Sequence, residues 1–363
     1  MKYTFIAFCL FLFSIFYGCK ERANEHRGLE QYRNYAAILK ATPLISDSII
    51  YGSSILYYRN DTIVLRCFQC DELLSEYVIR DDSLRWIGNF ARKGKGPLEI
   101  AGSLVNLFQD ELGIKYVYCT ENGQIDCFQV GEFADSKTWK RMDFPQQKGA
   151  GWSELAPSRD SLYLIIGGDL QTSTLFSVVD LKNYKISPIK DALYPNDQVE
   201  ARPITKALVY NSGGGIMKRP GATNEYLYFN HQFGNYAEII ELGDSMLLKR
   251  NAFLKGYPKY KEEDTSDKED LRGLGAYVTN KWIYILPKYS NNQIDTPKKE
   301  GYPTSFNDEI FLFDWKGNFV TSYQLDRPVV RYFAIDEKRN CMYAKTIHPE
   351  SDEEFLVRFQ LPD

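Results

Sequence analysis

Several features that would identify a common function are missing from this chain. Histidine occurs only three times in 363 residues, and no G-x-S-x-G or H-E-x-x-H signature is present. The net charge of −4 at pH 7 is mild, so nothing indicates a nucleic-acid-binding protein. Beyond the N-terminal leader, no run is long and apolar enough to span a bilayer. These absences exclude the catalytic classes that short motifs identify.

Helical periodicity is also missing between Leu44 and Leu361. Apolar segments recur there without intervening helical patterns, which argues against a parallel α/β sheet. Aromatic residues make up 15% of the chain, with 26 Tyr and 22 Phe, and such residues favour strands. The composition and the pattern together indicate an all-β protein.

The N-terminus reads as a targeting segment. Lys2 precedes an apolar run from Tyr3 to Tyr17, which at about 15 residues is typical of a signal peptide and too short to span a membrane. Gly18 and Cys19 resemble the lipobox of bacterial lipoproteins, in which the signal is removed and the cysteine carries lipid. An ordinary secretory signal with a chance cysteine is the alternative. Lipidation of Cys19 would tether the protein to a membrane.

This interpretation divides the chain into three parts. Residues 1–19 are expected to be a lipoprotein signal peptide, and residues 20–42 a polar tether with a short helix around residues 30–39. Residues 43–363 are long enough for one large domain or two ordinary ones, and we expect a single propeller domain. The expected location is the cell envelope, at the outer membrane, on its periplasmic or surface side.

An internal repeat decides the expected fold. Six short segments, most of which open with a turn-forming residue, continue as an apolar run, and their average spacing of about 56 residues suits a four-stranded propeller blade. Aligning them places six residues in register: Val64, Tyr118, Tyr163, Tyr228, Tyr284 and Tyr343. Each segment is preceded by an expected inner strand, such as SILYY, SLVNLF, SELAP or KALVY. Each is followed by a third strand, which is LRWIG in the first unit.

A fourth, outer strand can be assigned in five units; in the first unit it is GNFAR. The sixth unit has none, so its edge must be covered. We expect residues 43–52 to pair with the strand that ends at Leu361 and to close the ring; an open arc is the alternative. The predicted fold is therefore an all-β, six-bladed β-propeller, closed by an N-terminal strand joining the last blade.

The stretch WIGNFARKGKGPLEI, with Gly94, Gly96, Pro97 and Glu99, resembles the G-x-G-P-x-E signature of TolB-like six-bladed β-propeller lipoproteins of Bacteroidetes. Ile100 stands where an aromatic residue is commoner. The stretch from Glu309 to Ala344 resembles the last blades of that family. The resemblance implies an exported propeller lipoprotein, and it implies no particular reaction.

One face of the predicted ring collects most of the long connections. Loops from second to third strands, and from one unit to the next, share that face, and long loops are often functional. The long segments there are 91–102, 191–205, 255–273 and 287–308. The candidate ligand-binding face comprises Arg92, Lys95, Arg202, His231, Arg272, Tyr289 and His348.

Each candidate also has a structural explanation. Arg92 and Lys95, beside two glycines, could hold an anion or form a solvated turn. His231 and His348 lack a metal-ligand spacing, and the triple glycine at 213–215 is expected to be a flexible turn, since no phosphate-loop ending follows. The acidic segment 261–270 lacks the spacing of an EF-hand and is expected to be solvated.

Cys67 and Cys70 form a C-x-x-C. In a reducing compartment this spacing could indicate redox chemistry or zinc, whereas an oxidising compartment permits disulfides. Cys119 and Cys127 fall on neighbouring expected strands and could pair. Buried free thiols are the alternative for all four.

The function that these features favour is binding rather than catalysis. We expect a lipid-anchored propeller that acts as a binding or interaction module for a glycan, a small molecule or an envelope protein, with no cofactor, no metal and no nucleic acid. Tyrosines in the long segments suit stacking on sugars. The alternatives are a hydrolase or lactonase-like enzyme with a channel metal, and a structural subunit of an envelope complex.

Overall fold

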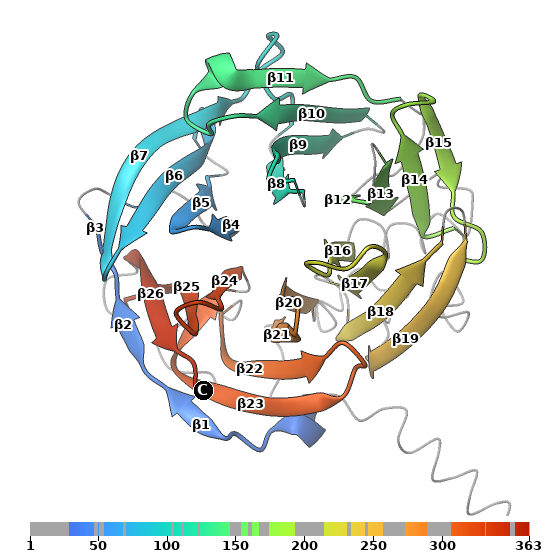
Figure 1. Cartoon of the computed structure of the whole chain (residues 1–363). Coiled ribbons are helices and arrows are strands. Elements are labelled where there is room, and N and C mark those ends of the chain that lie inside the picture. Colours follow the sequence, from blue (N-terminus) through green and yellow to red (C-terminus); the bar gives the residue numbers. More distant parts are fainter. Residues whose placement is uncertain are drawn as a thin grey trace, which may run out of the picture.

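A computed structural model shows a ring of small β-sheets around a central axis (Figure 1). It describes residues 29–46, 50, 54–67, 70–102, 105–110, 112–121, 124–145, 154–158, 162–166, 174–192, 214–230, 234–243, 246–256, 273–288, 306–330, 332–348 and 353–362. Within these ranges, strands alternate only with turns and two short 3-10 helices, η1 (Leu29–Tyr32) and η2 (Ser136–Thr138). The predicted all-β propeller fold is confirmed. In the same ranges, no helix has the length and apolarity needed to cross a membrane.

The described strands form six sheets, which we number in chain order. Sheets 1 to 3 contain β4 (Ser54–Arg59), β5 (Thr62–Arg66), β6 (Glu72–Arg80) and β7 (Ser83–Arg92); β8 (Val105–Gln109), β9 (Lys115–Glu121), β10 (Gln124–Val130) and β11 (Trp139–Met142); and β12 (Glu154–Pro157), β13 (Leu162–Ile166), β14 (Phe176–Asp180) and β15 (Lys185–Pro188). In each sheet, consecutive strands are antiparallel and the first strand lies nearest the axis (Figure 1).

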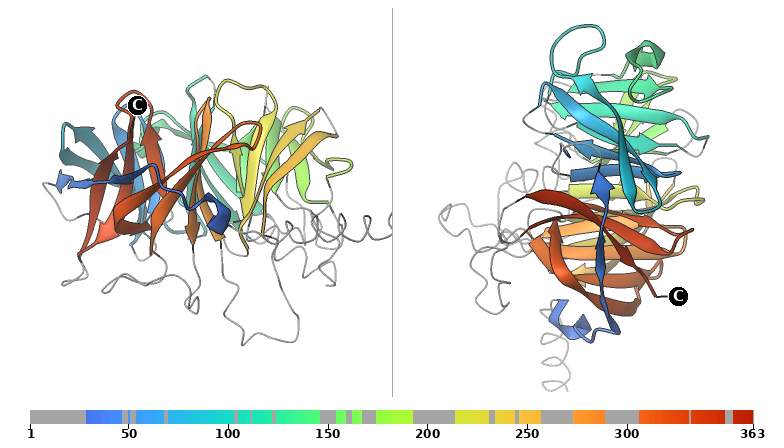
Figure 2. Two further views of the ribbon diagram at one scale, coloured as in Figure 1. Left: turned by 90° about the horizontal axis from the view of Figure 1, so that it is seen from below. Right: turned by 90° about the vertical axis from the view of Figure 1, so that its left-hand side faces the viewer.

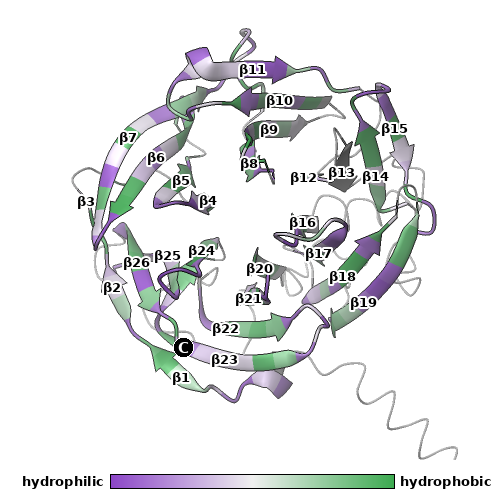
Figure 3. Cartoon of the chain, in the orientation of Figure 1, coloured by the Kyte–Doolittle hydropathy of each residue, from purple (hydrophilic) through white to green (hydrophobic). Residues whose placement is uncertain are grey.

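Sheets 4 to 6 repeat this order. They contain β16 (Gly214–Lys218), β17 (Glu225–Asn230), β18 (Tyr236–Leu242) and β19 (Leu247–Lys255); β20 (Gly273–Val278), β21 (Trp282–Lys288), β22 (Phe306–Asp314) and β23 (Phe319–Val330); and β24 (Phe333–Asp336), β25 (Cys341–Ile347) and β26 (Glu354–Gln360). Hydrophobic and hydrophilic residues are mixed along outer strands such as β7 and β19 (Figure 3), which face solvent on one side.

Tight turns join the strands within a sheet. Asn60 and Asp61, between β4 and β5, have φ values of 48° and 66°. This left-handed conformation suits two-residue hairpin turns, and Asn and Asp tolerate it better than most side chains do. The turn-forming residues that open the first repeat segment therefore act as a hairpin turn.

The hydrophobic core is divided among the interfaces between neighbouring sheets. Each pair of neighbours in the ring shares one cluster of buried side chains, including the pair formed by sheets 6 and 1. Three tyrosines of the repeat, Tyr118, Tyr228 and Tyr343 on second strands, belong to these clusters and are each no more than 2% exposed. These three tyrosines are thus packing residues between sheets.

An N-terminal segment, residues 29–46, wraps the outside of the ring, and we call it the clasp. Its strand β1 (Ala37–Leu39) pairs in parallel with β23, β2 (Ala41–Pro43) pairs antiparallel with β26, and β3 (Ile45–Ser46) pairs in parallel with β7. In Figure 2 the blue segment crosses the outer strands of the orange and red sheets. The missing outer strand of sheet 6 is therefore β2.

Closure by an N-terminal strand matches the prediction in kind, but its position is shifted. Of the expected segment 43–52, Pro43 lies opposite Val357, and the amide of Leu44 donates to the carbonyl of Leu356. Ile45 and Ser46 pair with sheet 1 instead. Residues 47–49 and 51–52 lie outside the described residues.

The described part of the expected tether is packed against the ring. A helix was expected around residues 30–39, but only the one-turn η1 forms, followed by β1. Leu29, Leu39 and Leu44 are each at most 4% exposed, and they enter the clusters between sheets 4 and 5, 5 and 6, and 6 and 1. Burial of these leucines and pairing along sheet edges outweigh the helical tendency.

Two strand assignments were wrong. In sheet 1, the third strand is β6, and the expected third and fourth strands, LRWIG and GNFAR, both belong to β7. In sheet 4, the triple glycine does not form a flexible turn, because Gly214 and Gly215 begin the inner strand β16. A Cβ at Gly215 would lie 2.5 Å from the Phe229 ring, so this glycine permits close packing. The expected strand KALVY lies outside the described residues.

The five cysteines among the described residues divide into two groups. Cys67 and Cys70 form a disulfide, whereas Cys119, Cys127 and Cys341 are buried free thiols. The considered pairing of Cys119 with Cys127 is wrong, because Cys119 lies opposite Asp126 on the neighbouring strand.

Candidate functional site

Arg66 lies at the centre of a polar cluster around the ring axis. It is the last residue of β5, and its backbone lies opposite Ser54, the first residue of β4. Its guanidinium Nη1 donates to the carbonyl of Val105 and to Oδ1 of Asn106, both at 3.3 Å. Although Arg66 is only 5% exposed, its side chain reaches from sheet 1 to the inner strand of sheet 2.

Two further sheets contribute to this cluster. The guanidinium carbon of Arg66 lies 5.4 Å from the ring centroid of Tyr332, directly before the inner strand β24, which is cation–π geometry. Glu154, the first residue of β12, interacts electrostatically with Arg66. The hydroxyl of Tyr118 donates to Glu154 Oε2 at 3.1 Å and accepts from the Leu155 amide at 3.3 Å. We call Arg66, Asn106, Tyr118, Glu154 and Tyr332 the axial cluster.

The axial cluster lies at one end of the ring. First and third strands start at this end, and second and fourth strands finish there, because consecutive strands are antiparallel. Arg66 ends a second strand, while Glu154 starts a first strand. This is the face on which the sequence placed the long connections.

The carboxyl of Glu154 titrates unusually. Burial raises the pKa of Glu154 to about 7, although the Tyr118 hydroxyl and the charge of Arg66 both act to lower it. Near neutral pH this group therefore exchanges between a carboxylic acid and a carboxylate. A site with such a group can donate or accept a proton or a hydrogen bond.

The cluster offers complementary groups to a polar ligand. Asn106, Glu154 and Tyr332 are each half-buried. They supply an amide, a titrating carboxyl and an aromatic ring with a hydroxyl, and Arg66 lies behind them. Converging polar groups beside an aromatic face are typical of sites for small polar molecules, including sugars.

Arg92 and Lys95 belong to a different feature. The chain after β7 turns through Gly94 and Gly96, and the Glu99 carboxylate folds back into this turn. The Gly96 amide donates to Glu99 Oε2 at 2.7 Å, and Arg92 Nε lies 3.9 Å from Glu99 Oε1. The turn thus already contains a carboxylate of its own chain, while Lys95 is exposed.

The glycines of this turn make room for that carboxylate. A Cβ on Gly94 would lie 2.0 Å from Glu99 Oε2, and one on Gly96 would lie 2.9 Å from the same atom. Ile100 closes the turn and is fully buried. The G-x-G-P-x-E pattern therefore has a structural role here.

The structure does not bring the other sequence candidates into the axial cluster. His348 is exposed directly after β25, and its backbone amide donates to the carbonyl of Glu353. Arg202, His231, Arg272 and Tyr289 lie outside the described residues, as do Cys19 and the tyrosines of the long segments.

Sequence reasoning missed the members of the axial cluster, although a signal was present. Arg66 ends the apolar run TIVLR, and Asn106 and Glu154 interrupt the expected inner strands SLVNLF and SELAP. Polar residues within apolar strand segments need partners. Arg66, Asn106 and Glu154 lie at the same end of their strands, and this shared position indicates that they can meet.

A channel metal was part of the enzymatic alternative. Among the described residues, no group of three or more His, Cys, Asp and Glu side chains is arranged to hold a metal ion.

Sequence comparisons find no relatives: no protein family matches the chain, and no characterised protein is similar to it. Among solved structures, a luciferin-regenerating enzyme has 7% identity and a TM-score of 0.44, over 85% of this chain and 90% of its own. A gluconolactonase from Xanthomonas campestris has 10% identity and a TM-score of 0.42, over 89% and 97%.

An alpha-L-arabinofuranosidase from Podospora anserina has 12% identity and a TM-score of 0.40, over 89% of this chain and 96% of its own. At such TM-scores and identities, these proteins carry no inference about the activity of this chain.

Proposed function

We propose that this chain is a lipid-anchored propeller of six blades, exported to the cell envelope, which binds a small polar ligand at its axial cluster. The six sheets and the six hydrophobic clusters between neighbouring sheets support the number of blades. The leader, which ends at Cys19, supports export and lipidation. The G-x-G-P-x-E turn supports kinship with the TolB-like lipoproteins.

The observation that carries the binding proposal is the convergence of Arg66, Asn106, Glu154 and Tyr332 from four different sheets. Packing within one sheet does not require polar groups from its neighbours to meet. Several half-buried hydrogen-bonding groups at one point provide orientation and specificity for a ligand. A glycan or a polar metabolite fits these groups best.

A binding screen tests this proposal. The purified chain is screened against glycans and polar metabolites, and Asn106→Ala is compared with Asn183→Ala, whose amide bonds Asp180 in an exposed turn of sheet 3. Loss of one hydrogen bond is expected to weaken binding by about fivefold to tenfold in Asn106→Ala alone. Equal binding by both variants would place the site elsewhere.

Membrane attachment is tested separately. Cells that produce the full chain are labelled with a fatty-acid analogue and fractionated, and Cys19→Ala is the comparison. The proposal expects label and membrane partition for the unaltered chain, and loss of both in Cys19→Ala. Label that persists in Cys19→Ala would contradict lipidation at this cysteine.

Hydrolysis is a second candidate because the Glu154 carboxyl titrates near neutrality, as general acids and bases do. Assays with lactones and esters, together with metal analysis of the purified chain, separate it from pure binding. An enzyme that uses this carboxyl is expected to lose at least about a hundredfold in rate in Glu154→Gln. Turnover unchanged in Glu154→Gln would exclude this role.

A further inference from the structure

The Cys67–Cys70 disulfide lies directly beside the axial cluster along the chain. It closes the connection between β5 and β6, and Cys67 immediately follows Arg66. The two Cα atoms are 5.5 Å apart, and the Cys67 amide donates to the carbonyl of Leu73 at 2.8 Å. The Arg66 backbone pairs with Ser54 of β4 and with Leu74 of β6, and the disulfide constrains the chain directly after it.

The contacts of Arg66 are sensitive to small movements. Both hydrogen bonds to sheet 2 measure 3.3 Å, which is at the long end of the usual range. A shift of a few tenths of an ångström at the end of β5 would break them. Because Arg66 joins sheet 1 to Asn106 and to Tyr332, its displacement would disturb the cluster as a whole.

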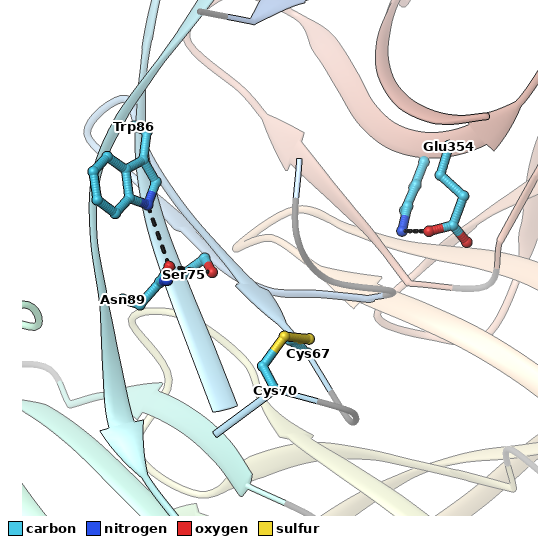
Figure 4. The surroundings of a disulfide bond; sticks show 7 residues. Cys67, Cys70, Ser75, Trp86, Asn89 and Glu354 are labelled. Atoms are coloured by element: carbon cyan, nitrogen blue, oxygen red, sulfur yellow. Dashed lines mark hydrogen bonds and ion pairs between the residues drawn. A yellow bond between two sulfur atoms is a disulfide. The ribbon is translucent and has the colours of Figure 1, made fainter. Parts of the chain in front are cut away.

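The far side of the connection is held independently of the disulfide. Figure 4 shows the disulfide with Asn89, whose Oδ1 accepts from the Ser75 hydroxyl at 2.7 Å and from the Trp86 indole at 3.2 Å. The bond from Ser75 ties β6 to β7, and the bond from Trp86 orients the Asn89 side chain within β7. Opening the disulfide should therefore loosen the end of β5 that carries Arg66 more than it loosens β6.

We propose that this disulfide is a thiol-exchange site that controls the axial cluster. The oxidised disulfide holds Arg66 in place, and its reduction releases Arg66. The inference concerns the site of the proposed function, but the order of the cluster can be measured without a ligand. The co-reactant is a dithiol, either a small molecule or a thiol–disulfide exchange protein of the envelope.

The exchange step follows from the exposure of the two cysteine residues. Cys70 is half-buried whereas Cys67 is 9% exposed, so a thiolate of the dithiol attacks Sγ of Cys70. The Cys67 thiolate leaves and takes up a proton. In the mixed disulfide, the second thiol of the co-reactant then attacks the sulfur that belongs to the co-reactant. This releases Cys70, which also becomes a thiol. Two electrons and two protons pass to the protein, and the dithiol becomes a disulfide.

Hydrogen–deuterium exchange of the full chain tests this proposal. The chain is compared before and after reduction with dithiothreitol, and alkylation with mass analysis counts the new thiols. We expect exchange to become about tenfold faster in the peptides spanning residues 105–110 and 332–336. A peptide spanning β18 serves as the internal reference and is expected to stay unchanged.

Two variants make the result specific. Cys67→Ser/Cys70→Ser is expected to exchange at the fast rate with or without reductant, and Cys341→Ser, which removes a buried free thiol, should respond to reductant as the unaltered chain does. Equal exchange before and after reduction, or free thiols at residues 67 and 70 in the untreated chain, would overturn the proposal. Neither result depends on whether a ligand or a lipid anchor is found.

Discussion

Single residues explain why the turn after β7 has its composition. The Glu99 carboxylate fills the space above Gly94 and Gly96 and accepts from the Gly96 amide. A side chain at residue 94 would displace the end of a flexible glutamate rather than the backbone. The cost of such a change is therefore the loss of this hydrogen bond.

A double-mutant cycle tests the coupling between these residues. Gly94→Ala and Glu99→Ala are each expected to lower the free energy of unfolding by about 1 kcal/mol. The double variant should lose about the same amount, because both changes remove one interaction. Denaturant titration measures all three, and strictly additive losses would contradict the assigned role of Glu99.

Another residue-scale effect is the dependence of stability on pH at Glu154. Its pKa is about 7 in the folded chain and about 4.3 in an unfolded one, so the folded state binds more protons between these values. This contribution to stability is complete below about pH 4 and is lost as the pH rises towards 7.

Replacing the carboxyl removes this pH dependence. As the pH rises from 4.5 to 7.5, the free energy of unfolding is expected to fall less in Glu154→Gln than in the unaltered chain. The difference between the two falls should be about 1–2 kcal/mol, a figure that allows for the partial exposure of the group. Urea titrations at several pH values give the comparison. If stability changed with pH equally in the two proteins, burial would not shift the pKa of this carboxyl.

At the scale of elements, the clasp connects three sheets through their outer edges. Besides its strands, Arg33 Nε lies 2.8 Å from Glu309 Oε1, and the Tyr35 hydroxyl donates to the same carboxylate. Glu309 is 5% exposed, so both partners compensate a buried charge. The clasp is thus fixed by leucine burial, backbone pairing and an ion pair.

Deleting the clasp should have a large effect on stability. Burying one leucine contributes about 1.5–3 kcal/mol, so loss of Leu29, Leu39 and Leu44 should lower the melting temperature by about 10 °C or more. A chain without residues 1–46 is compared with one without residues 1–28, which keeps the whole clasp. Equal melting temperatures for the two chains would contradict its closing role.

For the whole molecule, the junction of sheets 6 and 1 completes the ring. Arg339 Nη1 donates to Asp336 Oδ2 at 3.0 Å and pairs with Asp61 of sheet 1, and the Tyr58 hydroxyl donates to Asp336 at 2.7 Å. Burial acts to raise the pKa of Asp336, but the bonds from Tyr58 and from Arg339 outweigh it and hold that pKa below its usual value.

Arg339→Ala is expected to destabilise the ring by about 1–2 kcal/mol at pH 7, because it leaves a buried carboxylate with fewer partners. Since the pKa of Asp336 is lowered, its contribution is present above about pH 4 and is lost as the pH falls further. Arg141→Ala, which breaks the pair with Asp126 inside sheet 2, should cost less than about 0.5 kcal/mol. Similar losses in both variants would argue against a special role for the junction.

The sequence alone predicted the propeller because its repeat is local. Turn residues followed by β-favouring runs mark the second strand of each sheet, and a tyrosine such as Tyr228 is easily recognised in such a run. Glycine was harder to interpret: Gly215 packs against Phe229, a contact that only the fold reveals. LRWIG and GNFAR were assigned to two strands, whereas the single strand β7 runs through both and through the Gly88 that they share.

The candidate site was less accessible to sequence reasoning. Charged loop residues such as Arg92 are natural candidates for ligand binding, but Arg92 lies near a glutamate of its own turn. Arg66 and Glu154 are 88 positions apart in the numbering of the chain and meet only because the strands close into a ring. No local pattern encodes such a meeting.

The direction of the clasp strands determines how the molecule would bear mechanical load. A pull on the N-terminus is transmitted first to η1 and then along the axis of β1, which runs parallel to β23. In that geometry the bonds between the two strands are sheared together rather than unzipped one at a time. Beyond β1, the chain would have to peel from β26 and from β7 in turn, so tension applied ahead of the clasp reaches the inner strands last.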